Sequence, residues 1–167
     1  MAKRFYELEV AGVKRSLPVI NISDTLAIAG FVILGDTEIV EMMAAETKGI
    51  PLVQAMARIL GMPRYIVARK SIKAYMEHPL IVEDESITTQ GKQMLCLQDE
   101  DIDRVRGHKV TLVDDVISTG GSMKALEELV AKAGGTVNGK MAILAEGDSM
   151  GRKDITVLAN LPLFEAE

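Results

Sequence analysis

The chain has 167 residues, a formal net charge of −5, an apolar content of 48% and a single cysteine. The length suits one domain with its own core, and the acidic balance argues against a general nucleic-acid-binding protein. The apolar runs are too short to cross a membrane, the N-terminus does not resemble a signal peptide, and one cysteine allows no internal disulfide. We therefore expect a cytoplasmic protein with a single domain over residues 1–167 and neither nucleic acid nor a membrane as a partner.

The beginning of the chain predicts strands. Residues 5–10 and 13–22 have strand character on either side of an Ala-Gly turn, and residues 27–34 form a third apolar run that ends at Gly-Asp. Residues 38–45 fit a strand or a helical turn, because their apolar side chains match both spacings.

The middle of the chain predicts one helix, two short strands and a loop. Residues 50–60 carry apolar side chains at helical spacing and are followed by a glycine and a proline. Residues 65–68 predict a short buried strand, and residues 93–97 another, which would bury Cys96 as a small apolar side chain. Residues 72–90 are polar and show no clear period, so we expect a mobile loop there.

The last third of the chain alternates strands and helices. Residues 109–113, 140–145 and 155–158 predict strands, and residues 123–132 predict a helix that ends at a Gly-Gly pair. Such alternation is typical of an α/β fold, with a parallel central sheet and helices on both faces. Ligands of these sheets bind beyond the carboxyl ends of the strands.

The most informative stretch runs from Val110 to Met123, where a buried strand leads through two acidic residues into a loop of small residues and a helix. The loop and the helix start offer backbone amides, hydroxyls and the positive end of the helix dipole to a phosphate. Asp114 and Asp115 would repel phosphate, but they suit sugar hydroxyls or a magnesium ion. Together the groups fit a ribose 5-phosphate. The residues expected at the phosphate are Ser118, Thr119, Gly120, Gly121 and Ser122.

This stretch resembles the signature of type I phosphoribosyltransferases, which bind 5-phosphoribosyl 1-diphosphate. The resemblance implies that Asp114 and Asp115 hold the ribose hydroxyls and that the small-residue loop wraps the 5-phosphate. It also implies Mg²⁺ as cofactor, held indirectly by the two carboxylates through the ribose and the diphosphate. The fold implied is a parallel sheet with helices on both faces, with residues 1–26 as a small N-terminal hood.

A second candidate segment, Glu46 to Pro51, is a short loop that opens a helix, with Gly49 allowing a close backbone approach. Taken alone, it is more simply an ordinary helix start with Lys48 in solvent. It is similar to the diphosphate-binding loop of purine phosphoribosyltransferases. That similarity assigns the diphosphate to Glu46, Thr47, Lys48 and Gly49.

A third candidate group is basic: Arg69, Lys70 and Lys73 follow the strand expected over residues 65–68. Basic residues there can neutralise a diphosphate, and the alternative is a solvated basic turn. In the family that the chain resembles, an Arg-Lys pair at this place contacts diphosphate and the next loop closes over the site. We therefore expect Arg69 to act with Asp114 and Asp115 in catalysis, and all three basic residues to bind diphosphate.

The resemblance covers the chain from about Leu17 to its end and is closest to adenine phosphoribosyltransferases and archaeal-type hypoxanthine enzymes. Ile87 stands where the adenine enzymes carry tyrosine, and only residues 35–43 are available for a helix of the family, so that helix is expected to be shortened or missing. The resemblance implies transfer of the 5-phosphoribosyl group to a purine, giving a nucleoside monophosphate and diphosphate in purine salvage. Adenine is slightly favoured, with hypoxanthine, guanine and xanthine also open.

A different class of function also fits. Purine repressors use this fold as a non-catalytic phosphoribosyl diphosphate sensor, and Thr47 to Pro51 reproduces one of their stretches. The acidic balance, the complete set of diphosphate groups and the lack of an expected DNA-binding domain before the core favour the enzyme. From the resemblance we also expect a homodimer, with Met42, Met43 and Met56 as candidate interface residues.

Overall fold

The structure is a computed structural model that describes residues 4–10, 12–21, 23–29, 49–84 and 93–165. Several sequence-based expectations lie outside these ranges. They are the apolar run beyond Ala29, the ambiguous segment 38–45, the shortened helix over 35–43, the residues Met42, Met43, Glu46, Thr47 and Lys48, and the position of Ile87.

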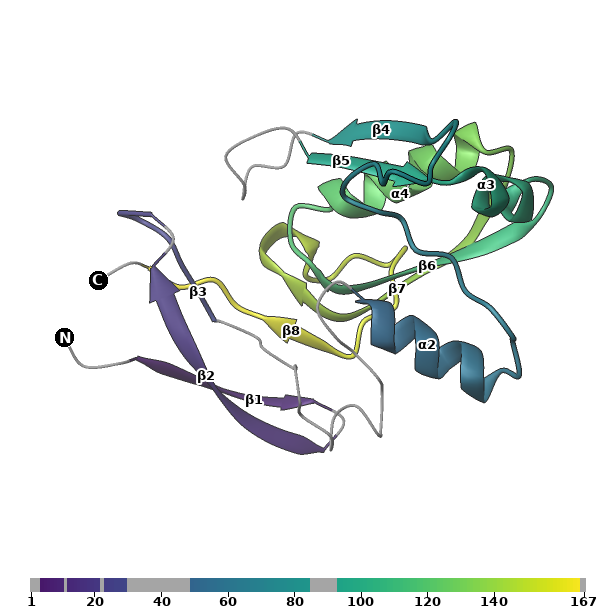
Figure 1. Ribbon diagram of the computed structural model, residues 1–167. Coiled ribbons are helices and arrows are strands. Elements are labelled where there is room, and N and C mark those ends of the chain that lie inside the picture. Colours follow the sequence, from purple (N-terminus) through teal and green to yellow (C-terminus); the bar gives the residue numbers. More distant parts are fainter. Residues whose placement is uncertain (1–3, 11, 22, 30–48, 85–92, 166–167) are drawn as a thin grey trace.

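The N-terminal part forms a three-stranded antiparallel sheet, as the sequence predicts. Its strands are β1 (Phe5–Val10), β2 (Val13–Asn21) and β3 (Ala27–Ala29), in the order β1-β2-β3. Alternate side chains of β1 and β2 are buried, because one face of this sheet packs on a core that includes residues of the C-terminal strands. Figure 1 shows this hood beside the rest of the molecule, next to the last strand.

The central sheet is parallel, as expected. It consists of β6 (Lys109–Ile117), β7 (Thr136–Glu146) and β8 (Ala159–Leu161) in the order β6-β7-β8. The strand predicted over residues 155–158 is wrong, since there only Thr156 forms a bridge, to Met141. The register places Ala159 opposite Leu144, so the chain reaches continuous pairing only after residue 158.

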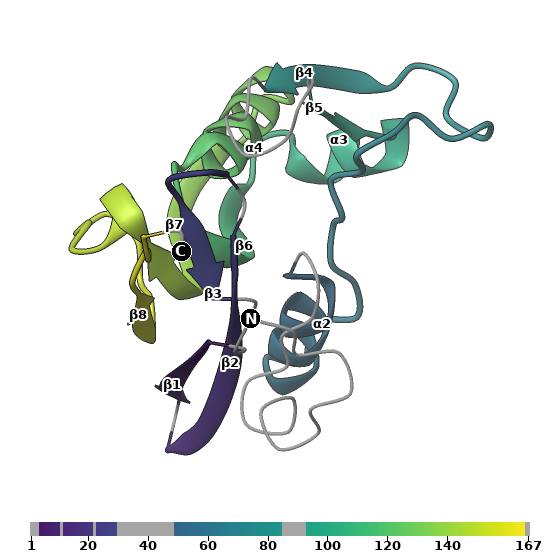
Figure 2. The same cartoon turned by 90° about the vertical axis from the view of Figure 1, so that its left-hand side faces the viewer.

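Two cores lie on the two faces of this sheet. Helix α4 (Gly121–Lys132), the crossover from β6 to β7, packs through Met123, Leu129 and Val130 on the core that contains Leu112. Helix α2 (Ile50–Ile59) packs with the hood on the other core, around Ile143 and Leu144. Figures 1 and 2 show α4 and α2 on opposite sides of β6 and β7, so helices cover both faces as predicted.

A two-stranded ribbon and a short helix complete the structure. Strands β4 (Leu80–Asp84) and β5 (Gln93–Leu97) pair antiparallel and pack on α4, and α3 (Asp99–Val105) follows β5. The expectation that residues 72–90 contain no regular element is therefore wrong at β4, whose strand conformation depends on its partner β5. Helix α3 was not predicted, because a helix of this length has too few apolar positions to show a period.

The strand predicted over residues 65–68 is wrong. This segment is extended but forms no ladder, and its only bridge in the described part of the chain joins Arg69 to Cys96. Cys96 is fully buried, as its apolar surroundings in the sequence predict.

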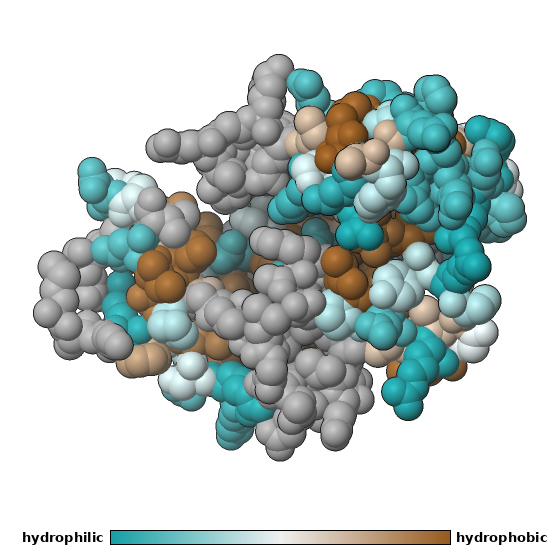
Figure 3. Space-filling model, in the orientation of Figure 1, coloured by the Kyte–Doolittle hydropathy of each residue, from teal (hydrophilic) through white to brown (hydrophobic). Residues whose placement is uncertain are grey.

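The outer surface over β4, β5 and α3 is mainly hydrophilic, with smaller apolar areas between the polar groups (Figure 3). None of the helices in the described ranges has the length and apolar character needed to cross a membrane.

Candidate functional site

The acidic pair lies inside β6 and not after it. The sequence predicts that this strand ends at Val113, but its pairing with β7 continues to Ile117, opposite Ala145. Leu112 and Ile117 belong to the core under α4, whereas Val113 and Val116 pack on the core under α2. Strict alternation would put Leu112 and Ile117 on opposite faces, so the alternation breaks between them, at Asp114 and Asp115.

Asp114 lies in an unusual electrostatic environment. The amide of Asp115 donates a hydrogen bond of 2.9 Å to Oδ1 of Asp114. Burial and, after it, the neighbouring Asp115 side chain together raise the pKa of Asp114 to about 7, although the charge of Lys70 acts in the lowering direction. A cation or a hydrogen-bond donor bound near Asp114 would therefore lower this pKa and favour the ionised carboxylate.

The loop after β6 has the form that binds an anion. Gly120 adopts the left-handed conformation, with φ of 85°, and forms the N-cap of α4 without any side-chain capping bond. The amide of Gly121 makes a long 3.5 Å contact with the Thr119 hydroxyl. The N-terminal amides of this 12-residue helix thus keep unused hydrogen-bonding capacity. Thr119 and Ser122 are exposed, and Ser118 is half-buried.

A second helix start lies against the acidic pair. Gly49 is the N-cap of α2, has φ of 71° and also lacks a side-chain cap, and Pro51 lies in the first turn. A Cβ atom on Gly49 would lie 3.1 Å from the carbonyl oxygen of Val113 and 3.2 Å from Cα of Asp114. The structure therefore places the end of the predicted diphosphate loop directly on the backbone of β6. Glu46, Thr47 and Lys48 lie outside the described residues.

The basic residues divide into two positions. The charge of Lys70 acts on Asp114, so the fold brings this predicted diphosphate residue into range of the acidic pair. Arg69 exchanges two backbone hydrogen bonds with Cys96, at 2.9 and 2.8 Å, and Lys73 donates to the Ser71 hydroxyl at 2.7 Å. Burial raises the pKa of the Cys96 thiol, and the charges of Lys73 and Arg69 oppose that rise.

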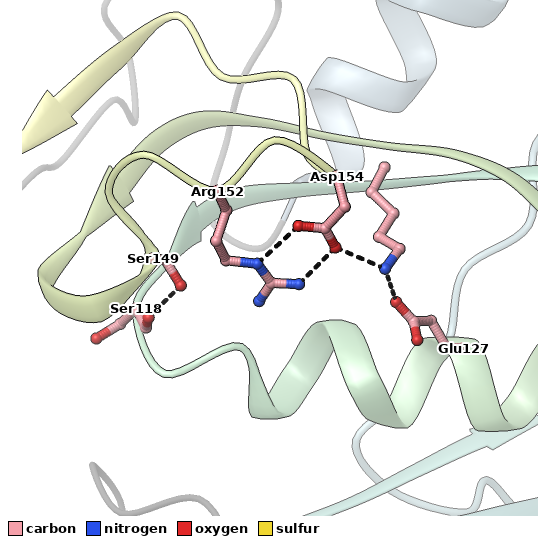
Figure 4. A network of polar contacts seen from close by, with 6 residues as sticks. Ser118, Glu127, Ser149, Arg152 and Asp154 are labelled. Carbon is pink, nitrogen blue, oxygen red and sulfur yellow. Dashed lines mark hydrogen bonds and ion pairs between the residues drawn. The ribbon is translucent and has the colours of Figure 1, made fainter.

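Three polar residues to which the sequence assigned no role reach the loop 118–122, where the phosphate is expected, from the end of β7 and from the turn after it. The Ser149 hydroxyl donates a hydrogen bond to the backbone carbonyl of Ser118. Glu146 is buried, which raises its pKa, while a hydrogen bond with the Ser118 side chain lowers it. Arg152 lies against Gly120 and is held by Asp154 (Figure 4). The one signal available in the sequence was the acidic residue Glu146, directly after the apolar strand predicted over residues 140–145.

The donor set for a metal ion is small. In the described part of the chain, no three side chains of histidine, cysteine, aspartate or glutamate come together as a metal site. Asp114 and Asp115 offer two carboxylates to a metal ion. Mg²⁺ is commonly bound through one or two carboxylates together with substrate phosphates and water, so this pair fits an ion that arrives with a phosphorylated ligand.

Comparisons with known proteins agree with this geometry. Residues 27–159 match the phosphoribosyl transferase domain family. A hypoxanthine/guanine phosphoribosyltransferase from Methanococcus voltae is 32% identical over 122 residues, which are 72% of this chain and 61% of that protein.

Two solved structures share the fold. Adenine phosphoribosyltransferases from Thermoanaerobacter pseudethanolicus and Rhodothermus marinus each give a TM-score of 0.58, at 29% and 27% identity. The matched regions cover 69% and 70% of this chain and 66% of each of those chains. The chain spans 61% of the length of the first two curated relatives that it matches. The family and the fold that the sequence resembles are confirmed: the chain belongs to the phosphoribosyltransferase family.

Proposed function

We propose that this protein is a purine phosphoribosyltransferase, which moves the 5-phosphoribosyl group from phosphoribosyl diphosphate to a purine base. The observation that carries the proposal is the arrangement around the acidic pair. Two helices, α2 and α4, both begin with an uncapped left-handed glycine at the carboxyl-terminal part of β6. A helix start of this kind favours an anion, and phosphoribosyl diphosphate carries phosphate groups at both ends of a ribose.

Each part of the ligand has a matching group in the chain. The loop 118–122 would hold the 5-phosphate, and Asp114 and Asp115, between the two helix starts, would accept hydrogen bonds from the ribose hydroxyls. The diphosphate would lie at the start of α2, with Glu46, Thr47, Lys48 and Gly49, and would draw on the charges of Arg69, Lys70 and Lys73. The nearness of Lys70 to Asp114 supports this placement of the diphosphate end.

The reaction requires charge stabilisation and not a covalent enzyme intermediate. The bond from ribose C1 to the diphosphate oxygen breaks, the bond from C1 to a purine ring nitrogen forms, and that nitrogen loses its proton. The sugar gains positive charge and the leaving group negative charge in the transition state. Arg69, Lys70 and Lys73 would stabilise the diphosphate, and Asp114 and Asp115 would orient the ribose and favour its developing positive charge. Mg²⁺, when bound with the ligand, would neutralise part of the diphosphate charge.

The base is the finer part of the proposal. The curated relatives are named for hypoxanthine and guanine, and the solved structures that match are named for adenine. The segment that carries Ile87 in place of the tyrosine of adenine enzymes belongs to residues outside the described ranges. Adenine and the 6-oxopurines are therefore tested side by side.

The test is a panel of bases. The protein is mixed with phosphoribosyl diphosphate, Mg²⁺ and, in turn, adenine, hypoxanthine, guanine, xanthine or uracil, and diphosphate release is followed, with Asp115→Asn as control. We expect release with at least one purine and a loss of about a hundredfold or more in the variant, because an uncharged amide replaces a ribose-binding carboxylate. If no base causes diphosphate release, while phosphoribosyl diphosphate still raises the melting temperature, the result would contradict the enzyme and favour a sensor.

We further propose that the protein is a cytoplasmic homodimer. Met56, one of the candidate interface residues, is half-buried and packs against the core under α2. Large apolar side chains are exposed where α2 ends, with Ile59 at 81% and Leu60 at 68% exposure. We expect a dimer by sedimentation velocity at micromolar concentration, and a shift to monomer in Leu60→Glu. A monomeric native protein would contradict the assembly without affecting the chemistry.

A further inference from the structure

The guanidinium of Arg152 lies directly on the phosphate loop. A Cβ atom on Gly120 would lie 2.7 Å from Nη1 of Arg152, and among the described residues that are not its chain neighbours only this guanidinium lies within 4 Å. Gly120 is the residue whose left-handed conformation turns the chain from β6 into α4. In Figure 4 the Arg152 side chain extends from the turn after β7 toward the beginning of α4. An arginine 32 residues away in the sequence therefore covers the glycine that shapes the loop.

Arg152 is fixed in this position by a network of ion pairs. Its Nε and Nη2 atoms donate to the two carboxylate oxygens of Asp154, at 3.0 and 2.7 Å. Asp154 also accepts a hydrogen bond of 2.9 Å from Lys140 of β7, and Lys140 pairs with Glu127 of α4. These partners hold the pKa of the Asp154 carboxyl well below its usual range. A planar, two-point arginine–carboxylate contact fixes the orientation of the guanidinium better than a single bond would.

The network begins and ends on the same helix. Arg152 touches Gly120 at the start of α4, and Glu127 lies about two turns further along it. The same turn after β7 contacts the loop at a second point, through the hydrogen bond from Ser149 to the Ser118 carbonyl. The loop 118–122 is therefore braced at two points, Ser118 and Gly120, by a segment that the sequence motif does not include.

One donor of the guanidinium is still available. Both carboxylate contacts use Nε and Nη2, and Nη1 makes no hydrogen bond to any residue in the part of the chain that the structure describes. Nη1 lies beside the loop 118–122, whose amides would face a bound anion. An anion in this loop would benefit from amides that keep one fixed direction, since a loop that must be ordered on binding loses affinity.

We propose that Arg152 is a positioning residue for the sugar 5-phosphate: its guanidinium, oriented by Asp154, fixes Gly120 and thereby the amides at the start of α4. The proposal rests on the proposed function, because it takes a ribose 5-phosphate as the ligand of this loop. It predicts a selective effect. The phosphate end of the ligand should depend on Arg152, and the diphosphate end, at the start of α2, should not.

The test compares Arg152→Gln with Arg104→Gln as a matched control. Both arginines have side chains that are 33% exposed, and both pair with an aspartate, but Arg104 pairs with Asp101 in α3. The dissociation constants of ribose 5-phosphate and of Mg²⁺-diphosphate are measured by calorimetry. We expect Arg152→Gln to weaken ribose 5-phosphate about tenfold and diphosphate less than about twofold, with both unchanged in Arg104→Gln.

A second variant keeps the test decisive if Arg152→Gln fails to fold. Arg152→Lys keeps the charge but loses the two-point contact with Asp154, so it should lose about fivefold in affinity for ribose 5-phosphate. Full affinity in Arg152→Lys, or an equal loss for both ligands in either folded variant, would overturn the positioning role.

The outcomes separate this inference from the proposed function. A native protein that binds ribose 5-phosphate but transfers nothing to any base would contradict the enzyme and leave the role of Arg152 open to the same comparison of affinities. A native protein that binds no ribose 5-phosphate at millimolar concentration would overturn both.

Discussion

Asp114→Asn is expected to stabilise the ligand-free protein at pH 8 and to lower phosphoribosyl transfer by about a hundredfold or more. The two effects have one cause, the burial of a carboxylate beside another carboxylate. Burial and Asp115 raise the pKa of Asp114 to about 7 from 3.8. At pH 8 the folded protein must hold this charge in an unfavourable place, and the amide removes it. Transfer suffers because the charge is what orients the ribose and favours its developing positive charge.

The pH dependence gives the sign of the effect. Between about pH 4 and pH 7 the folded protein keeps a proton on Asp114 that the unfolded chain has lost, so stability falls as the pH rises through this range. From pH 5 to pH 8 this contribution amounts to roughly 3 kcal/mol, since the loss covers about two pH units at about 1.4 kcal/mol for each unit. Asp114→Asn should lack this part of the fall. The measurement is the free energy of unfolding by denaturant at pH 5, 6, 7 and 8.

The matched control is Asp103→Asn, because Asp103 is an exposed residue of α3 paired only with Arg106 in the described residues. Its pH profile should follow that of the native protein. If the stability of Asp114→Asn falls between pH 5 and pH 8 as much as that of the native protein and of Asp103→Asn, Asp114 does not hold a buried charge at pH 8. If it keeps native transfer rates, the acidic pair does not act on the ribose in the way proposed.

Gly49→Ala is expected to destabilise the protein by about 2–5 kcal/mol and to reduce transfer strongly. The left-handed conformation of Gly49 costs a residue with a side chain about 1–2 kcal/mol. The added Cβ would also lie 3.1 Å from a backbone oxygen and 3.2 Å from a backbone carbon of β6. Backbone atoms of a paired strand cannot move aside easily, so overpacking adds about 1–3 kcal/mol. Relief by a shift of α2 would displace the diphosphate loop from Asp114.

Gly61→Ala separates the two contributions. Gly61 has φ of 67°, close to the 71° of Gly49, but a Cβ there would meet no atom of the described residues within 4 Å. Its substitution should cost only the conformational part, about 1–2 kcal/mol, and leave transfer at the native rate. The measurements are chemical denaturation and steady-state kinetics for both variants. Equal losses in stability, with native activity in Gly49→Ala, would mean that the contact with β6 has no importance.

The unit that we propose binds the phosphate was predictable because its residues are neighbours in the sequence. A buried strand, two carboxylates, small residues and a helix stand next to each other between Val110 and Met123, and the peptide backbone alone fixes how a glycine loop presents amides. The hood strands and the two amphipathic helices were predictable for a similar reason, since their apolar residues repeat at the period of the element. Their ends differ from the prediction by only a few residues.

The errors have a common origin in pairing between distant segments. The segment over residues 65–68 has strand composition but forms no ladder, and β4 is a strand because β5 lies beside it. Strand β6 runs past the acidic pair because β7 continues alongside it to Ala145. The break in alternation at Asp114 and Asp115 follows from that pairing and from the cores on both faces, neither of which is written in the local sequence.

The sequence by itself therefore determined the family and the α/β architecture, and it predicted the residues that we propose bind a phosphorylated sugar, because residue type and short spacing decide which groups the backbone offers. Only the tertiary structure decided which groups meet. It placed Gly49 on the backbone of Asp114, brought the charge of Lys70 to the same carboxylate, and laid Arg152 on Gly120. These interactions join segments 32 or more residues apart. They depend on the order and packing of the strands, which no local sequence pattern encodes.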